Sequence, residues 1–262
     1  MSESGHLVVL PDAAAVARAA AEQIAQRSAR AVAEAGRFTI ALSGGSTPKR
    51  LYALLADPAA PYRDRIPWDR VHVFFGDERH VPPDDPQSNF RMAREALLDR
   101  APIPAANVHR VLAERPADEA ASLYDEELRR AFSLAAGAAP RFDLVLLGMG
   151  NDGHTASLFP GTAALSERRR LVVANWVPKF SSWRITMTLP VFEAAAAVVF
   201  LVAGPDKAVP LAAVFDPSSP ADAYPCQLIR PVSGELLWLA DAAAASGVSP
   251  AVARLSGGES VT

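Results

Sequence analysis

A histidine and an aspartate lie two positions apart in a glycine-rich turn, directly after an apolar run of strand length. The run covers residues 142–147, and the turn reads GMGNDGH over residues 148–154. The ordinary pKa of imidazole suits a general base near neutral pH, and a neighbouring carboxylate can hold the ring in one tautomer. Open α/β sheets place such groups where their strands end. We therefore expect His154 to act as a base and Asp152 to orient it.

The same turn also matches G-x-G-x-x-G, the pattern of a dinucleotide-binding turn. That function requires the turn to open a full helix, with an acidic residue about 20 positions further on. Glu167 lies at a suitable spacing, but Pro160 and Gly161 interrupt the chain only a few residues after His154. The sequence therefore disfavours a dinucleotide site.

A second glycine-rich turn, SGGSTP at residues 43–48, follows the apolar run at residues 38–42. Glycines let backbone N–H groups approach an anion, and the start of a helix adds a positive partial charge. We expect Thr47 to cap this helix and Pro48 to take its first position. The turn is a candidate phosphate cradle, with an ordinary tight turn as the alternative; P-loop spacing is absent. The candidate residues are Gly44, Gly45, Ser46 and Thr47.

Charged side chains stand near the ends of other apolar runs. Asp77, Glu78 and Arg79 follow the run at residues 71–75, where Asp77 or Glu78 can orient a sugar hydroxyl and Arg79 can bind an anion. A solvated charged loop is the alternative. Arg184 and Lys207 are each typical of a surface, but with the cradle they can surround a phosphate. No group of His, Cys, Asp and Glu has metal-ligand spacing, so neither a metal nor a cofactor is expected.

The elements that must position these side chains follow from the apolar pattern. Strands are predicted at residues 6–10, 38–42, 71–75, 142–147, 171–175, 184–189, 197–203 and 235–239. Helices are predicted at residues 12–35, from 48, at 88–100, at 117–136, from 190 and after Asp206 as a cap. Alternating strands and helices indicate an α/β fold with a mainly parallel, Rossmann-like sheet covered by helices on both faces. No linker or repeat divides the chain, so one domain over residues 1–262 is predicted, with a frayed tail after Ser246.

Composition limits the classes of function. The chain has 262 residues, of which 50% are hydrophobic and 21% charged, so it can bury a sizeable core. A net charge of −3 gives no broad basic surface for nucleic acid. The single cysteine, Cys226, excludes a disulfide framework. Neither a signal peptide nor an apolar run of membrane-spanning length is present, so we expect a cytoplasmic protein without membrane contact.

Three motifs, in this order, resemble the 6-phosphogluconolactonase family. They are LSGGSTP at 42–48, FGDER at 75–79 with VP at 81–82 and SN at 88–89, and LGMGNDGHTASLFPG at 147–161. The residues RIT at 184–186 and the spacing Gly204-x-x-Lys207 fit the family as well. The resemblance covers nearly the whole chain. It implies an α/β fold of the glucosamine-6-phosphate deaminase/ribose-5-phosphate isomerase type.

The resemblance also implies an activity and roles for residues. The reaction would be hydrolysis of 6-phospho-D-glucono-1,5-lactone to 6-phospho-D-gluconate, the second step of the oxidative pentose phosphate pathway. His154 would activate water, with a small-molecule sugar-phosphate lactone as the partner and a monomeric protein. The residues implied around the phosphate are Gly44, Gly45, Ser46, Arg184 and Lys207. The supporting polar groups implied are Asp77, Arg79 and Asp152.

Two alternatives share these motifs. Glucosamine-6-phosphate deaminase-like isomerases carry a similar turn but place a glutamate five residues after the histidine, where this chain has Phe159. A sugar-phosphate-binding regulator without catalysis would use the same fold. The intact His154 and Asp152 argue against it, because a pure binder needs neither side chain.

Overall fold

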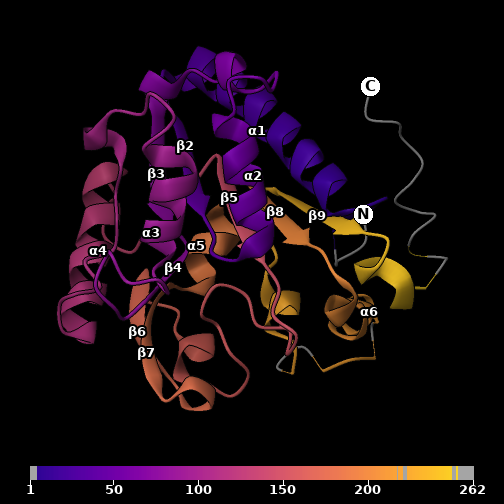
Figure 1. Ribbon diagram of the computed structural model, residues 1–262. Helices are drawn as coiled ribbons and strands as arrows, with labels where there is room; N and C mark the ends of the chain where they lie inside the picture. Colours follow the sequence, from indigo (N-terminus) through magenta and orange to yellow (C-terminus); the bar gives the residue numbers. More distant parts are fainter. Residues whose placement is uncertain (1–4, 217, 221–222, 250–251, 253–262) are drawn as a thin grey trace.

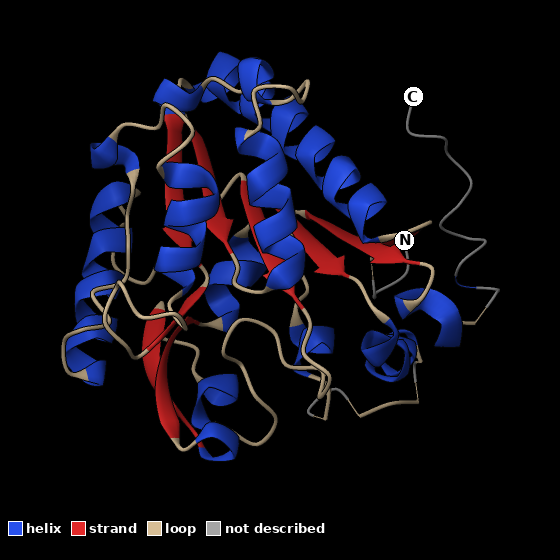
Figure 2. Ribbon diagram, in the orientation of Figure 1, coloured by secondary structure: helices blue, strands red, loops and turns tan. Residues whose placement is uncertain are grey.

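The fold is built around a six-stranded sheet, with a separate three-stranded sheet beside it (Figures 1 and 2). The computed structural model describes residues 5–216, 218–220, 223–249 and 252. All strand pairs of the large sheet are parallel, which confirms the predicted sheet type. In spatial order its strands are β1 (His6–Leu10), β9 (Glu235–Asp241), β8 (Ala197–Val202), β5 (Leu144–Gly148), β2 (Phe38–Leu42) and β3 (Val71–Phe75).

Helices flank this sheet. On one face, α1 (Ala13–Ala35) packs against α2 (Ser46–Ala56) and contacts β2, β8 and β9. On the other face, Phe132 at the end of α4 (Ala117–Ala131) packs on Phe74, with ring centroids 5.5 Å apart. The remaining helices are α3 (Asn89–Ala93), α5 (Leu189–Ala194) and α6 (Ala208–Phe215). Short 3-10 turns occupy Arg63–Arg65, Trp68–Arg70, Ala105–Asn107, Ala163–Ser166, Pro178–Phe180, Pro205–Lys207, Pro225–Leu228 and Ala244–Gly247, and a π-helical turn occupies Arg94–Leu98.

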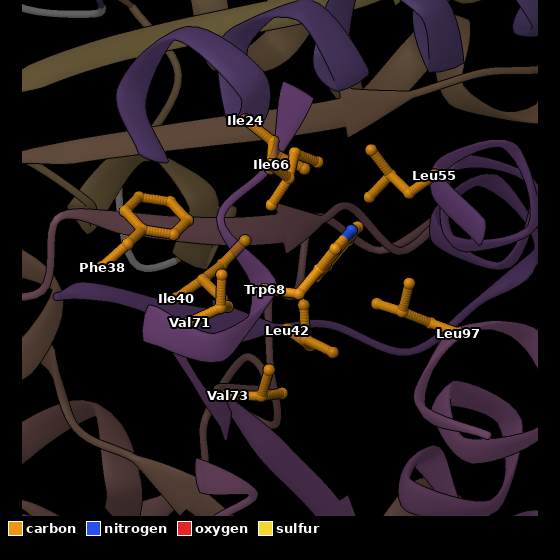
Figure 3. Close-up of a pocket in the computed structure, with 10 residues that line it drawn as sticks. All are labelled: Ile24, Phe38, Ile40, Leu42, Leu55, Ile66, Trp68, Val71, Val73 and Leu97. Atoms are coloured by element: carbon orange, nitrogen blue, oxygen red, sulfur yellow. The ribbon is translucent and has the colours of Figure 1, made fainter. Parts of the chain in front are cut away.

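The core between α1, α2 and the sheet is apolar throughout (Figure 3). Alternate residues of β2 and β3 point to this face, as the two-residue period of a strand requires. The side chains around one small space are Phe38, Ile40, Leu42, Val71 and Val73 from the strands, with Ile24, Leu55, Ile66, Trp68 and Leu97 opposite. Since none of them is an acid, a base or a nucleophile, this region serves packing.

The small sheet consists of β4 (Asp77–Arg79), β7 (Ser182–Met187) and β6 (Val172–Val177), in that order. Its strands are antiparallel, whereas the sequence pattern predicted β6 and β7 as members of one mainly parallel sheet and predicted no strand at β4. The turn at Pro178–Phe180 is too short for a crossover, so β6 and β7 form a hairpin. β4 follows β3 after the single residue Gly76, which carries the chain from the large sheet to the small one.

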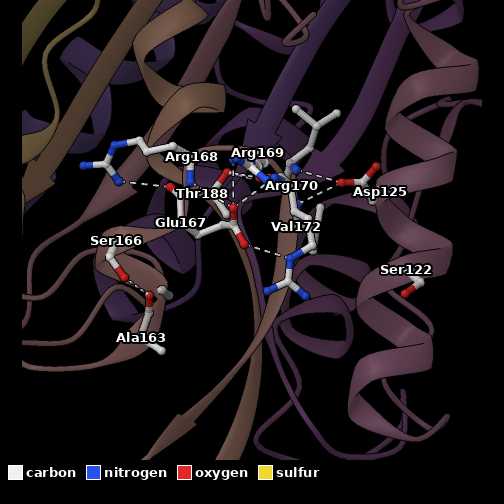
Figure 4. A network of polar contacts seen from close by, with 12 residues as sticks. Ser122, Asp125, Ala163, Ser166, Glu167, Arg168, Arg169, Arg170, Val172 and Thr188 are labelled. Carbon is white, nitrogen blue, oxygen red and sulfur yellow. Dashed lines mark hydrogen bonds and ion pairs between the residues drawn. The ribbon is translucent and has the colours of Figure 1, made fainter. Parts of the chain in front are cut away.

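The chain entering β6 is fixed to its surroundings by two carboxylates (Figure 4). Glu167 accepts backbone N–H groups from three consecutive arginines, of which Arg169 donates at 2.7 Å. Asp125 of α4 accepts the N–H of Leu171 at 2.7 Å and pairs with Arg129 at 2.6 Å. Glu167 thus fixes the turn before β6, and the Asp125 bond anchors the start of the β6–β7 hairpin to α4.

The observed caps and ends of the helices agree with the predicted ones in part. Asp12 caps α1 by accepting the N–H of Ala15 at 2.7 Å, and Ser88 caps α3, both as predicted. The predicted cap at Asp206 is wrong, because a 3-10 turn lies there and α6 begins after Lys207. The helix predicted over 117–136 ends at Ala131, and that predicted over 88–100 becomes π-helical from Arg94. Nearly all of the tail after residue 249 lies outside the described residues.

No helix in the described part of the chain combines the length and the apolar character needed to cross a membrane.

Candidate active site

Strand order brings the two glycine-rich turns together at one edge of the large sheet. From neighbouring strands the chain runs outward in opposite directions, from β2 to β3 and from β5 by way of the small sheet to β8. Such a reversal opens a crevice at the carboxyl ends of the strands. A Cβ added at Gly148, after β5, would lie 3.9 Å from the carbonyl oxygen of Gly44, after β2. The predicted base and the predicted cradle therefore share one rim.

The turn after β5 pairs His154 with Asp152. The Nδ1 atom of His154 contacts the Oδ1 atom of Asp152, and the N–H of Gly150 donates to the carbonyl of His154 at 2.9 Å. A carboxylate only accepts, so Nδ1 carries the proton and the lone pair of the ring is on Nε2. Nε2 has no hydrogen-bond partner among the described residues, and the side chain is 25% exposed. The pair can thus take a proton from a molecule in the crevice.

Glycine at position 150 is required by this pair. A Cβ there would lie 2.0 Å from Nδ1 of His154 and 2.8 Å from Oδ1 of Asp152. The glycine spacing therefore serves the histidine, not a dinucleotide. Past His154 the chain forms turns and a single 3-10 turn, Ala163–Ser166, in place of the full helix that a dinucleotide site needs.

Asp152 is bound on both oxygens. While Oδ1 faces His154, Oδ2 accepts a hydrogen bond from the Nζ atom of Lys179, at 2.7 Å. Burial raises the pKa of Asp152, but the hydrogen bonds from His154 and Lys179 outweigh it and bring the pKa well below its ordinary value. Asp152 is therefore a carboxylate near neutral pH. The sequence pattern gave no signal for Lys179, because a single lysine in a loop forms no motif.

Aromatic rings connect the base to the β6–β7 hairpin. Phe159 stacks on His154 with centroids 4.0 Å apart, and Phe180 packs edge-on against Phe159 at 5.6 Å. The guanidinium of Arg184 lies over Phe180, 5.4 Å from its centroid. The position that holds a glutamate in the deaminase-like alternative thus holds a ring that orients the imidazole.

One face of the small sheet supports the loop that carries His154. Ser157, three residues after His154, donates its hydroxyl to Asp77 of β4 at 2.6 Å. Its N–H donates to Thr186 of β7 at 3.2 Å, and its carbonyl accepts from Asn175 of β6 at 2.9 Å. All three strands therefore hold the same serine. Asp77 is buried here, so its contacts are with the protein's own loops.

A second buried acid, Glu78, points to the opposite face of β4. It accepts N–H groups from Arg79, Asn89 and Phe90 and the hydroxyl of Ser88, although burial still raises its pKa. Glu78 thereby fixes the start of α3. This places Asn89 so that its side chain donates to Asp77 at 3.2 Å and leaves no room for a Cβ at Gly44. Sequence analysis did not assign Asn89 a role.

Two arginines lie opposite each other on the small sheet. Arg79 of β4 pairs in register with Arg184 of β7, so their side chains share one face. Arg79 donates to the carbonyl of Gln87, and Arg184 donates to the hydroxyl of Ser182 at 2.7 Å. Neither has a carboxylate within 4.0 Å among the described residues. Burial, followed by the charge of Arg79, lowers the pKa of Arg184. Such a pair of like charges suits an anion.

The helix at the cradle begins two residues earlier than predicted. α2 begins at Ser46, its N-cap is Gly45 with a φ of 109°, and Pro48 is its third residue, so the predicted cap at Thr47 is wrong. Gly45 can take this left-handed backbone at little cost, which lets the chain enter the helix earlier. Within the described part of the chain, no acceptor binds the N–H groups of Ser46 and Thr47. The helix start is available to an anion.

Lys207 stands apart from the other cations. It lies in the 3-10 turn after β8 and pairs with Asp206 at 2.8 Å. Cys226, whose thiol lies 3.6 Å from the carbonyl of His154, has a pKa that burial and the charge of Asp152 raise and the charge of Lys207 lowers. Among the described residues, no hydrogen bond or ion pair joins Lys207 to Arg79 or Arg184.

A search of the described residues for three or more His, Cys, Asp or Glu side chains placed to hold a metal finds no such group.

Comparisons with known proteins identify the family. Residues 11–238 match the family model described as glucosamine-6-phosphate isomerases/6-phosphogluconolactonase. A 6-phosphogluconolactonase of Nostoc sp. is 50% identical over 243 residues, covering 92% of this chain and 97% of that protein. The human 6-phosphogluconolactonase is 38% identical, covering 92% and 93%. The structure of the Trypanosoma cruzi 6-phosphogluconolactonase superposes with a TM-score of 0.82 at 30% identity, covering 95% and 98%. The chain belongs to the glucosamine-6-phosphate isomerase/6-phosphogluconolactonase family.

Proposed function

We propose that this protein hydrolyses 6-phospho-D-glucono-1,5-lactone to 6-phospho-D-gluconate, with His154 as the general base. The observation that carries the proposal is the His154–Asp152 pair, whose Nε2 atom has no partner among the described residues and whose imidazole is linked through Phe159 and Phe180 to Arg184. The relatives named above are 6-phosphogluconolactonases, which supports the same reaction here. The expected substrate is a sugar-phosphate lactone, and a monomer stays the predicted state of assembly.

The chemistry needs one base that later acts as an acid. Nε2 of His154 takes a proton from water as the water oxygen bonds to C1 of the lactone. The resulting oxyanion collapses, the bond between C1 and the ring oxygen breaks, and the imidazolium returns its proton to that oxygen. Asp152 holds the ring and stabilises its charged form between these two steps. Backbone N–H groups of the glycine-rich turn are candidates for binding the oxyanion.

The phosphate is assigned to the cations and the start of α2. Ser46 and Thr47 offer free N–H groups and hydroxyls, with Gly44 and Gly45 allowing close approach. Arg184, Arg79 and Lys207 supply charge from β7, β4 and the turn after β8. A phosphate bound by these groups would hold the lactone carbonyl next to the water that His154 activates. Asp77 acts as a support for the loop and for Asn89.

The deaminase-like alternative lacks its carboxylate, because Phe159 stacks on His154 where that reaction would need an acid.

The test is an assay of acid release from freshly prepared lactone, corrected for spontaneous opening. We expect kcat/KM to be at least about a hundredfold higher with the 6-phosphate than with unphosphorylated glucono-1,5-lactone, since charged hydrogen bonds are worth about 1.5–3 kcal/mol each. Equal values would remove the phosphate site from the proposal. Binding of the phosphorylated product without any acid release above the spontaneous rate would instead identify a regulator.

A further inference from the structure

The tip of the β6–β7 hairpin contacts both members of the His154–Asp152 pair. Lys179 binds Oδ2 of Asp152, and the next residue, Phe180, packs on the ring that stacks against His154. Both side chains come from the 3-10 turn Pro178–Phe180, which Ser181 closes with a φ of 45°. The tip of the hairpin therefore contacts the His154–Asp152 pair, although it is not part of the 148–154 turn that carries this pair.

We propose that Lys179 is a positioning residue for the reaction: its ammonium group fixes the carboxylate of Asp152 so that Oδ1 faces His154. This inference rests on the proposed role of His154 as the base.

Two motions of the pair are restrained by different residues: rotation of the Asp152 carboxylate and rotation of the His154 ring. A carboxylate bound only on Oδ1 can rotate about its Cβ–Cγ bond and swing away from the imidazole. With Oδ2 held by Lys179 at 2.7 Å, that rotation breaks two charged hydrogen bonds at once. The plane of the imidazole is fixed separately by Phe159. Lys179 therefore constrains the acid, and Phe159 constrains the base.

Charge gives Lys179 a second effect, which can be measured. Its ammonium group lies on the far side of the carboxylate from His154 and opposes a positive charge on the imidazole. Among the described residues, the other charged or titratable groups near the turn are Asp152 itself, Tyr224, Cys226 from Pro225–Leu228, Lys207 and Arg184. Removing Lys179 removes its repulsion and leaves Asp152 as the dominant charge beside His154.

The test compares Lys179→Met and Lys179→Arg with the wild-type protein on the phosphorylated lactone. For Lys179→Met we expect kcat to fall about three- to tenfold with KM within about twofold, as removal of one half-exposed ion pair allows. The acidic limb of the kcat/KM profile should move upward by about half a pH unit. Lys179→Arg should restore most of both quantities, because a guanidinium can make the same bond.

A matched control removes a similar pair elsewhere. Arg30 of α1 pairs with Glu34 at 2.8 Å on the exposed surface, so Arg30→Met should leave kcat and the pH profile as they are. An unchanged kcat and profile in Lys179→Met would overturn the proposal. A raised KM with kcat preserved would also overturn it and identify Lys179 as a substrate-binding residue. His154→Ala tests the proposed function separately from the role of Lys179. Retained activity in that variant would refute His154 as the general base.

Discussion

Two histidine–carboxylate pairs lie in the described part of the chain, and only His154 keeps its second ring nitrogen free to act as the proposed base. His154 contacts Asp152 through Nδ1, and His109 contacts Glu127 of α4 through Nδ1 at 2.6 Å. The pairs share this contact but not their sequence spacing, which is 2 residues for Asp152 and His154 and 18 residues for His109 and Glu127. What differs is the other ring nitrogen and the place in the fold.

The Nε2 atom of His109 is already occupied. It forms a 3.1 Å hydrogen bond with Nδ1 of His72 on β3, and the His109 ring stacks on Phe74 with centroids 4.2 Å apart. The side chain of His109 is 9% exposed, against 25% for His154. His72, His109 and Glu127 therefore form a brace between β3 and α4. His109 thus has no ring nitrogen free to take a proton from a bound molecule.

The largest predicted effect contrasts the two histidines directly. His154→Ala should lower kcat by about 10²–10⁴-fold with KM largely kept, because a general base contributes that much. His109→Ala should keep kcat within about threefold, since the ring lies outside the site. Steady-state kinetics on the phosphorylated lactone, corrected for spontaneous opening, measure both. Comparable losses in the two variants would contradict the assignment of the base.

The second prediction tests the close approach at Gly150. Gly150→Ala should lower kcat about ten- to hundredfold, because its Cβ would displace the imidazole and the carboxylate together. Gly76→Ala is the matched control at the end of β3, where the added Cβ meets only the Leu42 carbonyl oxygen at an ordinary 3.6 Å. Circular dichroism should show both variants folded. Full activity in Gly150→Ala would mean that the pair tolerates displacement.

Local patterns predicted much of this site because its parts are contiguous in sequence. The turn at 148–154 places His154 and Asp152 within three residues, and Pro160 with Gly161 already excluded the dinucleotide helix. The apolar runs likewise predicted the strands of the large sheet, since parallel strands are apolar on both faces.

Contacts between distant segments could not be predicted in this way. Nothing in the sequence indicates that Lys179 reaches Asp152 across 27 positions, or that Ser157 is held by three strands. The separate antiparallel sheet was missed because the hydrophobic pattern of β7 does not reveal which strands it pairs with. The cap of α2 was misplaced because capping rules favour Thr47, whereas the φ of Gly45 decides the geometry.

The third prediction concerns stability at the other pair. Glu127→Gln should lower the melting temperature by about 2–5 °C, since it weakens the hydrogen bond to His109 and the ion pair with Arg130. Activity at 25 °C should stay unchanged. Asp152→Asn should give the opposite result, which is a large loss of kcat with a small change in melting temperature. Thermal unfolding and kinetics on both variants check the contrast; loss of kcat in Glu127→Gln would bring the brace into the mechanism.

The smallest effect lies in the pH dependence of stability. Burial lowers the pKa of His72, with further contributions from the charges of His109 and Arg37. Because the folded-state pKa lies below the unfolded value of about 6.5, the unfolded chain binds the proton first as the pH falls. The stability that neutral His72 contributes is complete above that pH and is lost as the pH falls through its folded-state pKa. Glu127, whose pKa is also lowered in the fold, adds a loss only at more acidic pH.

His72→Asn should therefore flatten the fall in melting temperature between about pH 7 and 5.5, without moving the acidic limb of the kcat/KM profile. Lys179→Met should do the reverse, because its charge acts on His154 and not on the brace. Melting curves and kinetic profiles over the same pH series provide both readouts for both variants. If His72→Asn moved the kinetic limb instead, protonation of the brace would be linked to catalysis, and the separation of the two pairs would fail.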